Sequence, residues 1–447
     1  MPCLSIKRLY VLFFLILLIS GVFSPYTRSL ASLPAYQTAI VGEPLSFTLS
    51  MPPTLRKHIA LETNRPGFLS RSGPASPPLV CRPGECFVHV KLFGVIPLRQ
   101  VAVSAYPPVR VIPGGQAIGV LLRTQGVIVV GSAPVSSGNK ERSPALEAGM
   151  RIGDVIVRID GKSVTAEEDV REAVDAAGRA GRALVFEVKR GSRTLEVKVR
   201  PRLCPETRRY RVGLLVRDSA AGVGTMTFCE PRSKIFGALG HIIADADTSQ
   251  GVEVAGGKIV EATIQAVRPG RRGQPGEKVG VFYGDGGLVG EITRNTGQGI
   301  FGTLEREISN PLYPRPIPVA LVSQVRPGPA EMLTVLHGRK IEKFSIEIVR
   351  VRPGVPADGK NLVLKITDRR LLREAGGIVQ GMSGSPIVQR GRLVGAVTHV
   401  FVNNPTRGYG IPAENMLRAC GLLRAVDASD RLSVRLYHEG GIRSNAA

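Results

Sequence analysis

The sequence predicts a mainly β-sheet protein with two or three domains. Short apolar or alternating segments recur between glycine turns along most of the chain, a pattern typical of barrels and sandwiches. The 447 residues include 52 glycines and 33 prolines but no tryptophan. Hydrophobic residues make up 43% of the chain, which is enough for several buried cores and argues against disorder.

The first 31 residues are expected to form a targeting segment. Lys7 and Arg8 precede an apolar run of about 15 residues, which is shorter than the roughly 20 residues that a membrane-spanning helix needs. Small residues at 29–31 offer a cleavage site. A cleaved signal peptide and a short signal anchor both stay open, and either one places the rest of the chain outside the cytoplasm.

Charge and cysteine content narrow the classes of function. The net charge is +23, but only 14 Phe and 9 Tyr are available for base stacking, so nucleic-acid binding is not expected. A basic surface facing anionic lipid and ordinary solvated charge both stay open. Cys81 and Cys86 are close enough in sequence to form a small disulfide loop, which also stays open. No cysteine and histidine spacing suggests zinc, so neither a metal nor a cofactor is predicted.

Residues 32–109 are expected to be β-rich or extended, with proline pairs interrupting them. A glycine-rich loop after Arg110 leads into strands, and Asp160-Gly161 predicts a hairpin turn. Thr165 is expected to cap a helix with an acidic first turn, because its hydroxyl can accept from the first free N–H groups.

Residues 110–202 resemble a PDZ domain of the kind associated with bacterial proteases. The resemblance rests on residues 143–161, which read Ser-Pro-Ala-x-x-Ala-Gly-Met-x-x-Gly-Asp-x-Ile-x-x-Ile-Asp-Gly. It implies an α+β fold with a partly open β-barrel that captures an extended peptide by adding it as a strand. The peptide carboxylate would meet a glycine-rich loop, a place taken here by Gln116, Ala117, Ile118, Gly119 and Val120.

The segment 203–425 reads as many short strands, ending in a helix near 415–420, and residues 426–447 read as a tail. Within it, Gly381-Met382-Ser383-Gly384-Ser385-Pro386 is followed by an apolar strand. Acyl transfer needs a serine on a tight turn with backbone N–H groups aimed at a developing oxyanion, and the glycines leave room for that approach. The spacing resembles the nucleophile turn of chymotrypsin-like serine peptidases. Ser385 competes as nucleophile, but its place before Pro386 fits the neighbouring position better.

A serine nucleophile needs a base, and His241 is the best candidate among six histidines. Small residues precede it, and Asp245 and Asp247 follow four and six residues later. His399 lies on the strand after the nucleophile turn and is expected to line the substrate cleft.

Nearly the full chain resembles the stage IV sporulation protein B peptidase family, and the resemblance is weakest in residues 32–109. Residues 236–241, Phe-Gly-Ala-Leu-Gly-His, and residues 366–386 carry the resemblance. It implies a chymotrypsin-like double β-barrel that follows the PDZ domain. It also implies His241 as base, Asp368 as the acid that orients it and Ser383 as nucleophile, with the N–H groups of Gly381 and Ser383 forming the oxyanion hole. On sequence alone, Asp245, Asp247 and Asp285 compete with Asp368.

The resemblance further implies a signalling endopeptidase of endospore formation. Such an enzyme crosses the forespore membrane and cleaves a regulator of a membrane metalloprotease, so that a late sigma factor precursor is processed. Its partners would be that protein substrate, the membrane through its N-terminal segment, and itself, because family members cleave themselves. Two alternatives stay open, a PDZ adaptor with a non-catalytic peptidase block and a general envelope quality-control protease.

Overall fold

The computed structural model describes residues 33–424 with internal gaps. The residues left out between these limits are 34, 46, 48–57, 72, 74–75, 138–139, 192, 244–253, 283–287 and 353–359. The chain divides into two compact units, one built on the residues up to Val109 and the other on Arg110–Ala320 and Val325–Gly421. No helix in the described ranges is long and apolar enough to cross a membrane.

The first unit contains a four-stranded sheet in the order β1-β6-β5-β2. Inward side chains alternate along β5 and β6, as expected for a sheet with one buried face. Cys81 and Cys86 are both free: the buried Cys86 Sγ lies 2.7 Å from Thr63 Oγ1, and Cys81 is exposed, so the disulfide left open by the sequence is not formed. The strands are β1 (Tyr36–Ile40), β2 (Ile59–Thr63), β3 (Leu69–Ser70), β4 (Leu79–Val80), β5 (Gly84–Leu92) and β6 (Ile96–Tyr106).

The PDZ segment packs one long helix against a twisted sheet and has its own hydrophobic core. The predicted Asp160-Gly161 turn is present between β11 and β12, with positive φ at both residues. Helix α5 begins one residue later than Thr165 predicts: Ala166 is its N-cap, and the Asp169 carboxylate accepts from the Thr165 and Ala166 N–H groups instead. The elements are β9 (Val135–Ser137), β10 (Lys140–Arg142), α4 (Pro144–Glu147), β11 (Val155–Ile159), β12 (Lys162–Ser163), α5 (Glu167–Arg179), β13 (Leu184–Arg190), β14 (Arg193–Val199), β15 (Arg202–Cys204) and β16 (Arg209–Arg211).

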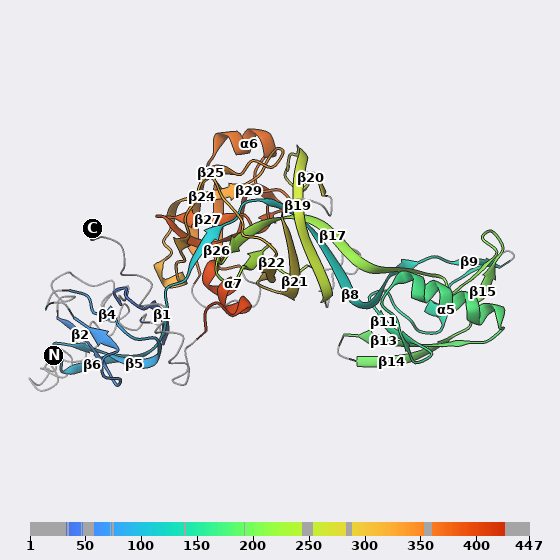
Figure 1. Cartoon of the computed structure of the whole chain (residues 1–447), viewed down its shortest axis with the longest axis horizontal. Coiled ribbons are helices and arrows are strands. Elements are labelled where there is room, and N and C mark those ends of the chain that lie inside the picture. The colour runs from blue at the N-terminus through green and yellow to red at the C-terminus, as the bar shows by residue number, and fades with distance from the viewer. Residues whose placement is uncertain are drawn as a thin grey trace, which may run out of the picture. The chain divides into compact units, whose positions relative to one another are not determined.

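The first of two barrels in the second unit is a ring of strands in the order β8-β19-β21-β22-β18-β17, and the β17–β8 pairing closes it. The paired strands β8 and β17 are long and also extend into the PDZ sheet, so both modules share them (Figure 1). The elements are β7 (Arg110–Pro113), β8 (Ala117–Ser132), β17 (Leu214–Cys229), β18 (Ile235–Ala238), β19 (Val254–Arg268), β20 (Glu277–Phe282), β21 (Val289–Thr296), β22 (Gly299–Leu304), β23 (Ile317–Pro318) and the 3-10 helix η1 (Val322–Gln324).

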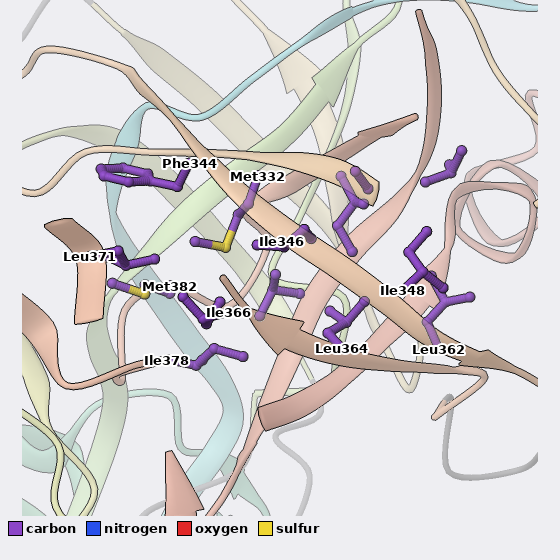
Figure 2. Close-up of a cluster of buried hydrophobic side chains, with 14 of the residues drawn as sticks. Met332, Phe344, Ile346, Ile348, Leu362, Leu364, Ile366, Leu371, Ile378 and Met382 are labelled. Atoms are coloured by element: carbon purple, nitrogen blue, oxygen red, sulfur yellow. The ribbon is translucent and has the colours of Figure 1, made fainter. Parts of the chain in front are cut away.

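The second barrel is closed in the order β24-β25-β26-β29-β28-β27. Its core is lined by large apolar side chains of β24, β25 and β26, and Met382 of the nucleophile turn packs beside Ile366 and Leu371 (Figure 2). The prediction of a mainly β fold, with an α+β module of the PDZ kind and a double β-barrel, is confirmed. The elements are β24 (Gly328–Thr334), β25 (Glu342–Val351), β26 (Leu362–Ile366), α6 (Arg369–Ala375), β27 (Pro386–Gln389), β28 (Arg392–Phe401), β29 (Asn404–Pro412) and α7 (Ala413–Cys420).

Four of the five residues expected to bind a peptide carboxylate lie in a strand, and Gln116 directly precedes that strand. Residues 118–120 lie inside β8 and pair with β17 on one side and β19 on the other, so ladder bonds use their backbone groups. Gly119 serves close packing, because a Cβ there would lie 2.3 Å from the Phe282 ring. The carboxylate-binding loop predicted at Gln116, Ala117, Ile118, Gly119 and Val120 is therefore replaced by a strand at four of these five positions.

Candidate active site

A cleft of about 950 Å³ is lined by residues of both barrels. Ser383, His241 and His399 all line it, which confirms the expectation that His399 lies at the cleft. Its walls are largely apolar, with a hydrophobic contribution from both barrels. The apolar lining residues are Val120, Ala220, Ala221, Val223, Leu239, Ile242, Ile243, Pro275, Ile378, Val379, Val400 and Val402.

The turn that carries Ser383 depends on its two glycines. Gly381 and Gly384 have φ values of +88° and +92°, a region that side chains rarely adopt. A Cβ on Gly384 would lie 2.0 Å from the Thr225 carbonyl oxygen. The turn therefore requires glycine at 384 for close approach as well as for its backbone conformation.

Strand β17 of the first barrel anchors this turn through hydrogen bonds. The Thr225 hydroxyl donates to the Gly381 carbonyl at 2.7 Å, and the Thr227 hydroxyl donates to the Gly384 carbonyl at 2.8 Å. The Thr225 N–H donates to the Ser383 carbonyl at 3.0 Å. Both threonines are fully buried, so these bonds lie in a region of low dielectric. The sequence analysis missed both residues, and the only local signal was their alternation on a strand.

Two N–H groups of the turn are available for an oxyanion. The N–H groups of Gln380, Met382, Gly384 and Ser385 all donate to backbone carbonyls. No such bond engages the N–H of Gly381 or Ser383 within the described part of the chain. Unused, fixed donors beside a nucleophile are what an oxyanion hole requires, and these are the two donors that the family resemblance implies.

Of the two candidate serines, only Ser383 faces the cleft. Its hydroxyl donates to the Thr398 carbonyl at 2.6 Å. Ser385 is fully buried, is not among the residues that line the cleft, and its hydroxyl has no partner among the described residues. The geometry thus favours Ser383 as the reactive serine.

His241 follows two residues in the left-handed region, Leu239 and Gly240, which turn the chain out of β18 into the cleft. Gly240 packs on Thr398, the residue whose carbonyl holds the Ser383 hydroxyl. Nδ1 of His241 donates to the Ile242 carbonyl at 2.7 Å, which leaves Nε2 as the proton acceptor. Burial lowers the pKa of His241, and the bond to Ile242 opposes this only in part, so the ring is neutral at neutral pH.

Asp368 does not meet His241 in this structure. It is the N-cap of α6, where one carboxylate oxygen accepts from the N–H groups of Arg370 and Leu371 at 2.9 and 3.0 Å. The other oxygen lies 3.4 Å from the Ser345 N–H. Among the described residues, no hydrogen bond or ion pair joins it to His241, and it does not line the cleft. An Asp just before a helix satisfies the free N–H groups there, which explains its placement.

The region beside His241 nevertheless offers a donor for a carboxylate. Thr398 is buried, and its hydroxyl has no partner among the described residues. The competing acids Asp245, Asp247 and Asp285 lie outside the described residues. Within the described ranges, no group of three or more His, Cys, Asp or Glu side chains could hold a metal ion.

Parts of the chain are similar to known proteins. It is 30% identical over 119 residues to a protein of Brucella suis named as a zinc metalloprotease, covering 25% of this chain and 31% of that protein. It is 38% identical over 60 residues to the serine protease HTRA1 of Xenopus tropicalis, covering 13% of this chain and 12% of that protein. The chain therefore spans about a third or less of the length of the curated relatives it matches.

Solved structures that resemble it include two serine proteases. The active form of the Rv3671c protease of M. tuberculosis has a TM-score of 0.25 and 15% identity, covering 46% of this chain and 78% of that one. The thermostable serine protease AL20 of an extremophilic microorganism has a TM-score of 0.27 and 12% identity, covering 45% of this chain and 92% of that one.

Two family models match the chain itself. Residues 117–200 match the PDZ domain, and residues 208–417 match the SpoIVB peptidase S55 family. The second match contains the threonines of β17, His241 and the nucleophile turn, and so it includes the residues that meet at the cleft. Residues 208–417 are therefore similar to serine peptidases of the SpoIVB type, and residues 117–200 are similar to PDZ domains.

Proposed function

We propose that Ser383 is the nucleophile and His241 the general base of an endopeptidase. One observation carries the proposal: the serine hydroxyl, the neutral imidazole and the unused N–H groups of Gly381 and Ser383 belong to one cleft. In the resting structure the Ser383 hydroxyl donates to the Thr398 carbonyl, so this hydrogen bond must break before the hydroxyl can give its proton to His241.

The reaction then follows from these groups. Ser383 Oγ attacks the carbonyl carbon of the scissile peptide while its proton passes to Nε2 of His241. The carbonyl electron pair moves onto oxygen, where the two backbone N–H groups donate to it. When that pair returns, the C–N bond breaks and His241 gives its proton to the leaving amine. Water, deprotonated by His241, then attacks the acyl-enzyme in the same way and releases the acid.

We infer that this chemistry serves signalling between compartments during endospore formation. In this role the enzyme is exported across, or anchored in, the forespore membrane by residues 1–31. It cleaves itself and a regulator of a membrane metalloprotease, and processing of a late sigma factor precursor follows. The match of residues 208–417 to the SpoIVB peptidase family supports this role.

The first test separates an enzyme from a PDZ adaptor. A fluorophosphonate probe reacts with an activated serine, so wild-type protein should be labelled, whereas Ser383→Ala lacks the reacting hydroxyl and should not be labelled. Ser385→Ala is the matched control and should keep its labelling. Labelling that survives in Ser383→Ala and disappears in Ser385→Ala would move the nucleophile to Ser385. An unlabelled, folded wild-type protein would favour the adaptor.

A second measurement addresses the signalling role. N-terminal sequencing of the protein made in sporulating cells should show self-cleavage in the wild type and none in Ser383→Ala. The same cells should fail to process the sigma factor precursor when Ser383 is replaced. Normal processing in the Ser383→Ala strain would leave a general quality-control protease as the better description.

A further inference from the structure

A buried lysine lies next to Gly381, whose N–H is one of the two proposed oxyanion donors. Lys278, on β20, is 5% exposed, and its ammonium donates to the hydroxyl of Thr334 at 2.6 Å. No carboxylate pairs with it among the described residues. Burial of an amine without a counter-charge is costly, and here it lowers the pKa of Lys278 to about 7. A side chain kept at such a cost calls for a role that an apolar residue cannot fill.

The stem of Lys278 packs against Gly381. Its Cβ, Cδ and Cγ lie 3.1, 3.3 and 3.4 Å from the place where a Gly381 Cβ would be. The backbone joins the same two segments: the Lys278 N–H donates to the Gln380 carbonyl at 2.9 Å, and the Gln380 N–H donates to the Gly276 carbonyl at 2.8 Å. The start of the nucleophile turn therefore rests on β20, with the lysine stem against the residue that offers one oxyanion donor.

Thr334 ties this arrangement to the second barrel. It is the last residue of β24 and is fully buried, whereas β20 is paired to β19 of the first barrel. The backbone of Lys278 belongs to the first barrel, and its ammonium is bound to Thr334 of the second barrel. The side chain therefore links the two barrels. A cavity of about 340 Å³, lined by Lys278, Gln380 and Gly381 among others, borders the same point.

We propose that Lys278 is a positioning residue, which through its anchor on Thr334 holds Gly381 so that its N–H points at the oxyanion. The inference rests on the proposed function of Ser383 and adds the residue that sets the geometry of its oxyanion hole. A misplaced donor would weaken transition-state binding without altering ground-state binding, because the hole is filled only when the oxyanion forms.

The test is the reaction of the full chain with a fluorophosphonate probe. Ser383 displaces fluoride from phosphorus, and the phosphonyl oxygen enters the oxyanion hole. In Lys278→Met, which keeps an unbranched stem, the maximal labelling rate should fall about ten- to a hundredfold, whereas the concentration for half-maximal rate stays within about threefold. The melting temperature should be unchanged or higher, because the apolar methionine replaces a buried amine that has no counter-charge among the described residues.

Two further variants complete the design. Thr334→Val leaves the lysine in place but removes the partner of its ammonium, and it should lower the maximal rate in the same way. Lys365→Met changes an exposed lysine on β26 and should have no effect. Normal labelling of Lys278→Met and Thr334→Val would overturn the proposal, and so would a lower melting temperature with equal losses in both labelling constants. Failure of the wild type to label would instead refute the proposed function.

Discussion

At the scale of single residues, the site depends on which polar groups are already satisfied. In the turn formed by residues 380–385, four backbone N–H groups donate to backbone carbonyls. Among the described residues, no such bond engages the N–H groups of Gly381 and Ser383. Nδ1 of His241 donates to the Ile242 carbonyl, so Nε2 is the nitrogen that can accept a proton. The proposed catalytic groups are those left over, because burial forces most polar atoms to be paired.

The labelling rate should depend on pH through His241. The neutral ring is the base, and burial disfavours its charged form, so its pKa lies below the ordinary value of 6.5. The rate should therefore rise with pH to a plateau, with its midpoint below 6.5, when Ser383 labelling is followed from about pH 4.5 to 8. A midpoint at or above 7 would mean that a carboxylate contacts the ring, because a nearby negative charge stabilises the imidazolium.

At the scale of elements, strand β17 and helix α6 both support the turn that carries Ser383. Strand β17 supplies the threonine hydroxyls that hold the turn. Helix α6 begins at Asp368, and its Leu371 packs beside Met382 in the core of the second barrel (Figure 2). Asp368 therefore contributes to the site by starting a helix that supports the turn, whereas the resemblance alone gives it a direct contact with His241.

Substitutions at Asp368 distinguish these two roles. Asn is as good an N-cap as Asp, so Asp368→Asn should keep its melting temperature and most of its Ser383 labelling rate. Asp368→Ala should lose about 1 kcal/mol of stability, as uncapped helices do. Loss of about four orders of magnitude in Asp368→Asn at unchanged stability would restore the orienting role. Asp→Asn variants at 245, 247 and 285, labelled in parallel, identify the acid if one of them carries that role.

At the scale of the whole molecule, the PDZ and peptidase modules share strands β8 and β17. Both strands begin or end in the PDZ sheet and continue into the first barrel, where they pair with each other. The boundary between the modules therefore crosses two strands. A sequential arrangement of a complete PDZ domain at 110–202 and a separate peptidase at 203–425 does not describe this connection.

The shared strands predict how the PDZ segment can be removed. Arg123 pairs with Ser219, so deletion of residues 124–218 with an Asn-Gly turn should close β8 and β17 into a hairpin and keep the first barrel. This variant should fold and label at Ser383, whereas deletion of 110–202 removes a barrel strand and should not fold. Circular dichroism and labelling check both. Folding and labelling of both deletions would show that the barrel does not need β8, and failure of both would show that the barrel depends on residues 124–218.

The sequence by itself determined what is local. The nucleophile turn, the glycines that it requires, the hairpin at Asp160-Gly161 and the small residues that lead to His241 are encoded within a few positions, because turn geometry depends on neighbouring residues. The mainly β class followed from the spacing of apolar segments for the same reason.

The tertiary structure decided what joins distant segments. Thr225 and Gly381 are 156 residues apart, and Lys278 and Thr334 are 56 apart, yet each pair forms a hydrogen bond next to the turn. The glycine-rich stretch at 116–120 reads as a loop, but pairing with strands on both sides makes it part of a barrel wall. The family resemblance predicts Asp368 as a catalytic acid, but its carboxylate accepts hydrogen bonds from the first N–H groups of its own helix. Long-range pairing and burial, which no local pattern contains, set these outcomes.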